Sequence, residues 1–442
     1  MARAATLLRG LSLATLVGWS AAGSPSSIAA QPAEAGLAVP ARDDEIVEQL
    51  PQHVGDAAQR RAARVAERAQ RAQLQAHPDE LALALQAARD ALERGRRHGD
   101  PRELGTVEAA LAPWWTLADP PPEVQLVRAT VHQSQHAFQD ALVDLDALLA
   151  RPELALPVRA QAELTRAGVQ QVLGHLADAE AGCRRLAGPT FLALGDGARR
   201  NALACLAELA SLQGRDAAAA ATLSRLAGAP TPDAPGDGPG WLQLMRAELA
   251  QRRGDPAAGP LFAAAVQANP DVYSLCADAD WLLDAGRPGE ALALLKGHEA
   301  ADPVLLRIAL AERAAYGAHD ARTRRDTRLL GERFDAALLR GDRSHGREQS
   351  RYALDLRGDA AAALRLAQAN WRVQHEPADA VALVRAAHAA RRDVAADDVW
   401  RYMRETGGRD VRLAAGGPAA APFLPAAASA PPAFLATTGS AR

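Results

Sequence analysis

The chain has 442 residues, with 50 basic and 53 acidic side chains, a formal net charge of −3 and an aromatic content of only 4%. This near balance of charge excludes the strong positive field of a typical nucleic-acid-binding protein, so we expect no nucleic-acid partner. Because large side chains are scarce, the core has to be built from helices that pack closely on alanine and other small residues.

Residues 1–30 have the pattern of an export signal. Arg3 and Arg9 give a positive start, and the apolar run Leu11–Ala22 is too short to span a bilayer. Small residues up to Ala30 offer a cleavage site. No cysteine follows the run directly, which argues against a lipid anchor, and no later stretch predicts a transmembrane segment. We therefore expect a soluble periplasmic or otherwise exported protein. A cytoplasmic protein with an apolar N-terminus is the alternative.

Residues 31–77 are predicted to form a flexible lead-in with short helices. The segment begins rich in alanine and proline and becomes polar and arginine-rich after Pro51. Pro78 and Asp79 then open a firmer helix with an apolar stripe at helical spacing. A break that starts at Gly99 and a second helical segment complete the first predicted hairpin.

Five further hairpins share one pattern. Their turns fall 38, 40, 40 and 32 residues apart, at His136, Gly174, Gly214, Gly254 and Gly286. Seven residues before each turn stands an alanine, namely Ala129, Ala167, Ala207, Ala247 and Ala279. Five residues after each turn stands a small residue, namely Ala141, Ala179, Ala219, Gly259 and Ala291. A stack of helical hairpins explains these offsets, because each hairpin brings its two helices together at one small site.

Less regular hairpins are predicted for residues 301–406, with turns near Gly317, Gly358 and Arg392. Within the regular array, residues 229–240 read as a turn-rich insert that no helix can cross. From position 407 the composition shifts to alanine, glycine, proline and threonine, which predicts a disordered tail over 407–442. No alternating strand pattern occurs in the sequence, so the prediction is an all-α fold.

The stretch Val272–Pro303 resembles a tetratricopeptide repeat. It has Ala279 at the small site of the first helix, Gly286 at the turn, Ala291 at the small site of the second helix and Pro303 as terminator. The resemblance is best over residues 78–300 and weaker over 301–406. It implies a solenoid of helical hairpins wound into a right-handed superhelix, in which the first helix of each pair lines a concave face.

The sequence departs from this family at several places. Most of the family's aromatic positions hold other residues, and larger side chains stand where small ones are expected at Leu310, Arg322 and Arg351. A generic helical solenoid is therefore the structural alternative.

If the family geometry holds, polar and aromatic positions of the first helices form a partner-binding groove. The candidates are Thr130, Gln133, Gln161, Gln171, Asn201, Glu208, Trp241, Glu248, Tyr273 and Asp280. Amides suit the backbone of an extended peptide, aromatic rings suit anchoring, and the acids, with Asp284, favour a partner that carries arginine or lysine. Ordinary solvated faces and internally packed aromatics are the alternative. We expect a protein or peptide partner in a bacterial cell envelope, not a small-molecule ligand.

Two of the three cysteines can form a disulfide. Cys183 falls on the second helix of one predicted hairpin and Cys205 on the first helix of the next, so their side chains come within reach in a stack. An oxidising compartment would allow the bond. The alternative is a pair of small buried thiols.

Catalytic and metal-binding signals are weak. His132 and His136 have a spacing that can hold a metal, but no third ligand is evident. His375 and Glu376 begin like a metalloprotease motif whose second histidine is missing. Instead, Glu376 is expected to cap a helix together with Asp379, and we expect no metal and no cofactor. The sequence thus predicts a non-catalytic scaffold. An envelope hydrolase or metal-dependent enzyme that carries helical repeats is the alternative.

Overall fold

The computed structural model describes residues 57–228, 240–339 and 345–413. Regular structure in these ranges is helical throughout, and no strand occurs in them, which confirms the predicted all-α fold. The predicted signal segment, the lead-in up to residue 56, the insert at 229–239 and the tail from residue 414 lie outside the described residues.

Most helices pair into hairpins along the chain. After α1 (Ala57–Ala76), the first layer contains α2 (Leu81–His98), α3 (Arg102–Ala110), α4 (Ala112–Trp115), α5 (Pro122–Ser134), α6 (Phe138–Leu149), α7 (Leu156–Val172), α8 (Leu176–Leu186), η2 (Pro189–Leu194), α9 (Asp196–Leu212), α10 (Asp216–Gly228), α11 (Gly240–Arg253) and α12 (Ala258–Ala268).

The remaining hairpins form a second layer. It contains α13 (Val272–Asp284), α14 (Pro288–Leu295), α15 (Asp302–Tyr316), α16 (Ala321–Leu339), α17 (Gly346–Arg351), the π-helical turn η3 (Tyr352–Leu356), α18 (Ala360–Trp371), α19 (Pro377–Ala389), η4 (Asp393–Ala396), α20 (Asp397–Thr406) and η5 (Val411–Leu413).

The predicted turns adopt left-handed backbone conformations, and the small residues at the predicted offsets from them are buried. The turn positions His136, Gly174, Gly214, Gly254 and Gly286 all have positive φ angles, between 57° and 80°. Residues that stand seven before and five after these turns are buried, and nine of the ten are alanines that are at most 3% exposed. Each hairpin therefore brings its helices together at a small residue and reverses at a left-handed position.

The hydrophobic core is divided into clusters that follow the chain. Phe138 and Leu145 belong to a cluster shared by α5, α6 and α7, whereas Leu176 and Cys183 belong to one shared by α7, α8 and α9. Because each cluster joins only consecutive elements, the packing is that of a solenoid and not of a globule with one centre.

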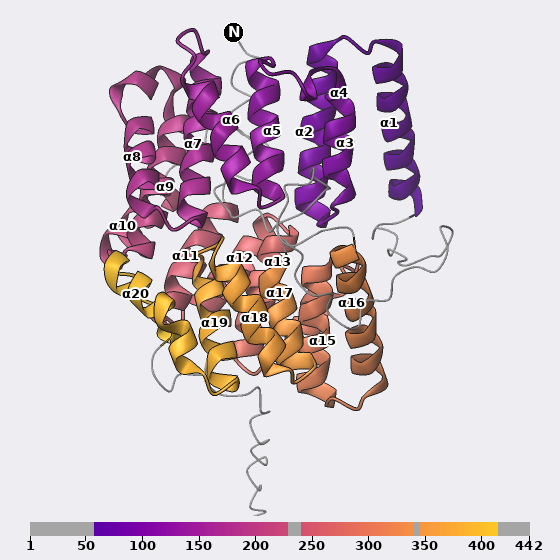
Figure 1. Ribbon diagram of the computed structural model, residues 1–442, viewed down its shortest axis with the longest axis vertical. Coiled ribbons are helices and arrows are strands. Elements are labelled where there is room, and N and C mark those ends of the chain that lie inside the picture. Colours follow the sequence, from indigo (N-terminus) through magenta and orange to yellow (C-terminus); the bar gives the residue numbers. More distant parts are fainter. Residues whose placement is uncertain (1–56, 229–239, 340–344, 414–442) are drawn as a thin grey trace, which may run out of the picture.

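The solenoid coils back on itself. Figure 1 shows α2 to α10 as an upper row (indigo to magenta) and α15 to α20 as a lower row (orange to yellow). Polar contacts join the two layers: Arg96 pairs with Asp271 at 2.7 Å, and the backbone N–H of His375 donates to the carbonyl of Val172 at 2.8 Å. The turn at Gly214 touches the backbone of Gly407. The concave face is therefore covered by later hairpins and is not an open groove.

The described end of the lead-in is one helix of 20 residues, α1, in keeping with the helices predicted for this segment. Two other details differ from the sequence-based expectations. Pro303 is the second residue of α15 and so begins a helix, because proline fits the first turn where its missing N–H is not needed.

The first residues of the predicted disordered tail also have a defined place in the fold. Residues 407–413, here called the C-terminal strap, lie against the rest of the protein, with Asp410 and Leu413 buried. The strap runs past the turns at Gly214 and Gly254, and composition alone does not reveal such a docking site.

The structure also contains the Cys183–Cys205 disulfide, with 6.0 Å between the two Cα atoms. The bond links α8 to α9 inside a hydrophobic cluster, so it joins two neighbouring hairpins. Cys276 is a buried free thiol.

Candidate functional site

A cavity of about 430 Å³ lies where the two layers of hairpins meet. It is lined mainly by residues of α7, α9, α11, α13, α15, α17 and α19, each the first helix of its hairpin. Ala258 and Phe262 of α12 and Arg412 of the strap also line it. Its volume is within the range of small-ligand pockets, about 300–1,000 Å³. The first helices therefore do face a common concavity, but closure of the coil reduces it to a partly open cavity.

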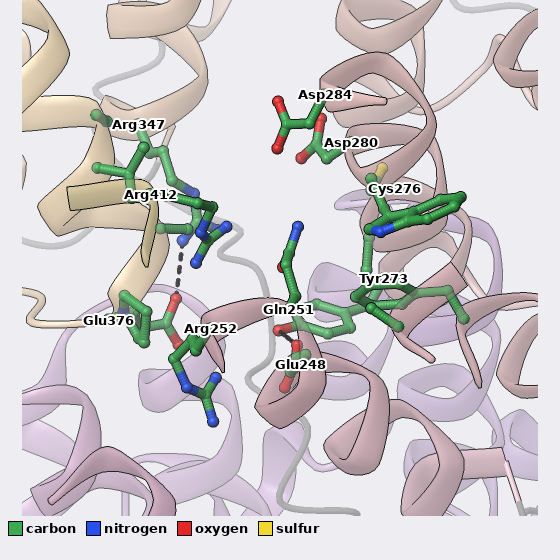
Figure 2. Close-up of a pocket in the computed structure, with 18 of the residues that line it drawn as sticks. Glu248, Gln251, Arg252, Tyr273, Cys276, Asp280, Asp284, Arg347, Glu376 and Arg412 are labelled. Carbon is green, nitrogen blue, oxygen red and sulfur yellow. Dashed lines mark hydrogen bonds and ion pairs between the residues drawn. The ribbon is translucent and has the colours of Figure 1, made fainter. Parts of the chain in front are cut away.

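Half of the predicted groove residues line this cavity. They are Gln171, Glu208, Glu248, Tyr273 and Asp280, and Asp284 lines it as well. Figure 2 shows Tyr273, Asp280 and Asp284 projecting from the same helix, α13, above Glu248 of α11.

The other predicted groove residues lie elsewhere. Thr130 and Gln161 are buried, and the Thr130 hydroxyl donates to the carbonyl of Leu126. Trp241 packs into a hydrophobic cluster. Gln133 and Asn201 are partly buried but do not line the cavity.

Their height along the helices explains the difference. In α7, α9 and α11, only the C-terminal ends meet the second layer, and Trp241 lies seven residues before Glu248, or about 10 Å lower at 1.5 Å per residue. The candidates were chosen by their offset from the small residue of each first helix. That offset does not show which end of the helix the second layer covers.

Sequence reasoning missed the arginines of the cavity. Arg307, Arg347, Arg351, Arg385, Arg412 and Arg252 all line it. Figure 2 shows Arg347 and Arg412 on one side and Asp280 and Asp284 on the other, so the cavity has a basic wall opposite an acidic wall. One signal was available: Arg351 occupies an expected small site, and a π-helical turn, often found at functional sites, follows it.

Asp280 is held as a carboxylate by two arginines. Arg307 donates to it at 2.8 Å, and Arg351 donates two hydrogen bonds at 2.9 Å each. Burial alone would raise the pKa of Asp280, but Arg307 and Arg351 outweigh it and hold the pKa well below its usual range. This acid is therefore occupied by the protein's own arginines and is not free to bind a partner's cation.

A second ion-pair cluster closes the basic wall. Arg347 donates to Glu376 at 2.9 Å and to Asp379 at 3.2 Å. Asp379 in turn accepts the backbone N–H of Glu376 in a capping box, which confirms the predicted capping of α19. Burial lowers the pKa of Arg347, but Asp379, Glu348 and Glu376 raise it well above its usual value.

The floor of the cavity has a different electrostatic character. Burial, followed by the charge of Glu248, raises the pKa of Glu208 to about 8. Burial also raises the pKa of Glu248, although Arg252 and Tyr273 oppose the shift. Gln171 donates to Glu208 at 2.8 Å, and Tyr273 donates to Glu248 at 2.6 Å. The floor thus holds two carboxyl groups that are costly to ionise together.

Other candidate residues have structural surroundings. His136 lies beyond the end of α5, so the spacing of His132 and His136 does not place them on one helix face. In the described residues, no group of three or more His, Cys, Asp or Glu side chains is arranged to hold a metal. Burial raises the pKa of Cys276 to about 12, so this thiol is protonated at neutral pH.

In the described part of the chain, no helix has the length and apolar character needed to cross a membrane.

The structure supports consecutive packed helix pairs as the architecture, and the tetratricopeptide assignment remains a resemblance. Neither a protein-family model nor a curated protein matches this chain.

Proposed function

We propose that this protein is an exported, non-catalytic scaffold, built from divergent tetratricopeptide-like hairpins, that captures a short peptide segment of a partner in the bacterial cell envelope. The observation that carries this proposal is the cavity lined mainly by the first helices of consecutive hairpins. Its volume admits a segment of a few residues and excludes a folded domain.

The chemistry of the lining supports a polar peptide over an apolar ligand. Tyr273 and Trp281 offer flat contact surfaces, and charged and polar side chains make up much of the remaining lining. Arg412 uses its Nε and Nη2 atoms on Asp410, and its Nη1 has no part in that pair. A backbone carbonyl or carboxylate of the segment would be a suitable acceptor for it.

Two observations support the remaining parts of the proposal. The Cys183–Cys205 disulfide suits an oxidising compartment, in keeping with the export signal expected for residues 1–30. The protonated state of Cys276 suits a structural role for the thiol in the cavity and not a nucleophilic one.

Site-specific photo-crosslinking in intact cells tests the proposal. A photoreactive aromatic amino acid would replace Tyr273 in the cavity or, as a control, Val143, which is 68% exposed on α6. We expect a peptide-containing adduct from position 273 and little or none from position 143. Equal adducts at both positions, or none at position 273, would contradict capture in the cavity.

A further inference from the structure

The floor of the cavity contains polar atoms that the fold leaves unsatisfied. Among the described residues, none provides a hydrogen-bond partner for Gln171 Oε1, Glu208 Oε2 or Arg252 Nε. All three residues line the same cavity. Buried polar atoms are nearly always paired in native proteins, so this group of atoms points to a ligand.

The orientation of Gln171 is set by its neighbour. The side chain is only 7% exposed, and its Nε2 atom donates to Glu208 Oε1. This bond uses one N–H of Nε2 and fixes the orientation of the amide, so that Oε1, which accepts hydrogen bonds and cannot donate them, is the atom without a partner. A ligand atom at this place therefore has to be a donor.

The two carboxyl groups set the charge of the ligand. The charge of Glu248 makes ionisation of Glu208 harder, and Arg252 opposes the rise in the pKa of both acids. The Tyr273 hydroxyl already donates to Glu248 Oε1. A cation between them would offset their repulsion, and its N–H groups would donate to Glu208 Oε2 and Gln171 Oε1. Asp280 does not compete for this cation, because Arg307 and Arg351 already neutralise it.

We infer that the corner formed by Gln171, Glu208 and Glu248 binds the side-chain cation of a lysine or arginine in the captured segment. This inference rests on the peptide-binding function proposed above and narrows it to one class of anchor residue. Arg412, which lines the same cavity, would then face an acceptor of the same segment.

A random hexapeptide library, retained on the purified full chain, tests the inference. We expect the retained pool to be enriched in lysine or arginine. The best peptide is then compared with copies in which norleucine replaces lysine or citrulline replaces arginine, and with an N-acetylated copy that reports on the terminal amine. Loss of the side-chain charge should raise Kd at least tenfold, or about 1.4 kcal/mol.

Protein variants locate the effect. In Glu208→Gln/Glu248→Gln, the difference in Kd between the lysine peptide and its norleucine copy should fall to less than about twofold. Glu153→Gln, the same substitution at an exposed position outside the cavity, should retain the full difference. Circular dichroism and thermal unfolding check that the variants fold.

The outcomes separate the two proposals. Retention of peptides without enrichment of lysine or arginine, or an unchanged charge preference in the double variant, would overturn the cation site and leave peptide capture standing. A dependence on the terminal amine alone would also overturn the side-chain assignment. If no hexapeptide is retained, peptide capture itself is contradicted, and the cation site with it.

Discussion

Arg351 binds Asp280 across 71 residues of sequence, through two hydrogen bonds of 2.9 Å each. Arg351 belongs to α17 in the second layer, and Asp280 belongs to α13. Arg351 departs from the repeat pattern, because a small residue is expected seven positions before the turn at Gly358. The departure thus serves the cavity wall and not the close approach of two helices.

We expect Asp280→Asn to destabilise the protein by about 3–5 kcal/mol, because it leaves Arg307 and Arg351 close together without their shared carboxylate. Asp284→Asn is the matched comparison, one turn further along the helix. Burial and the charge of Asp280 raise the pKa of Asp284, so removal of its charge should not destabilise the protein. Urea unfolding monitored by circular dichroism measures both, and equal effects would contradict the role of the Asp280 pair.

The disulfide predicts the number of reactive thiols. Denatured, unreduced protein should show one thiol, that of Cys276, and reduced protein should show three. Reduction should also cost about 2–4 kcal/mol of stability, because the bond closes a loop between residues 22 apart in sequence. Titration with a chromogenic thiol reagent decides the question, and three thiols before reduction would exclude the bond.

Contact between the C-terminal strap and the first layer can be tested at two glycines with the same backbone geometry. Gly214 and Gly286 have φ angles of 69° and 70°, so alanine at either position costs about 1–2 kcal/mol of strain. A methyl group at position 214 would also collide with the carbonyl of Gly407, whereas the space around Gly286 is open.

We therefore expect Gly214→Ala to lower the unfolding midpoint in urea more than Gly286→Ala does. Identical midpoints would indicate that the strap does not rest on the turn at Gly214 in solution.

The raised pKa of Glu208 makes stability depend on pH. The folded protein holds this proton up to a pH of about 8, whereas an unfolded glutamic acid loses it near its ordinary value of 4.5. The unfolded state therefore binds fewer protons between these values, and stability should fall as pH rises through this window. Glu208→Gln, which cannot ionise, should raise Tm at pH 9 by about 2–4 °C and change it little at pH 4. Scanning calorimetry at both pH values measures this, with Glu153→Gln as control.

Binding of a lysine peptide should show the opposite pH dependence. The groups that face Glu208 are Gln171, Glu248, Arg252 and Glu376, and a bound cation would favour its ionised form. Below pH 8, binding has to release the proton first, so Kd should decrease about tenfold from pH 7 to pH 9. Calorimetric titration in two buffers of different ionisation enthalpy would also detect the released proton. A flat pH profile would contradict a role for Glu208 in binding.

The periodicity of small residues determined the fold. Ala129 and the corresponding alanines are buried at hairpin contacts, and the predicted turns adopt left-handed backbone conformations. These features could be predicted because the contacts within a hairpin and between neighbouring hairpins are local in sequence. The capping of α19 by Glu376 and Asp379 was predictable for the same reason.

Tertiary structure alone decided the site. The coil closes through contacts between residues far apart in sequence, such as Arg96 with Asp271 and Gly214 with Gly407, and these contacts have no periodic signature. Closure determines which ends of α7, α9 and α11 face the cavity, and it brings the arginines of α17, α19 and η5 opposite α13. Local contacts determine the rotation between one hairpin and the next. The cavity depends on the sum of many such rotations, because small differences in each of them accumulate along the solenoid.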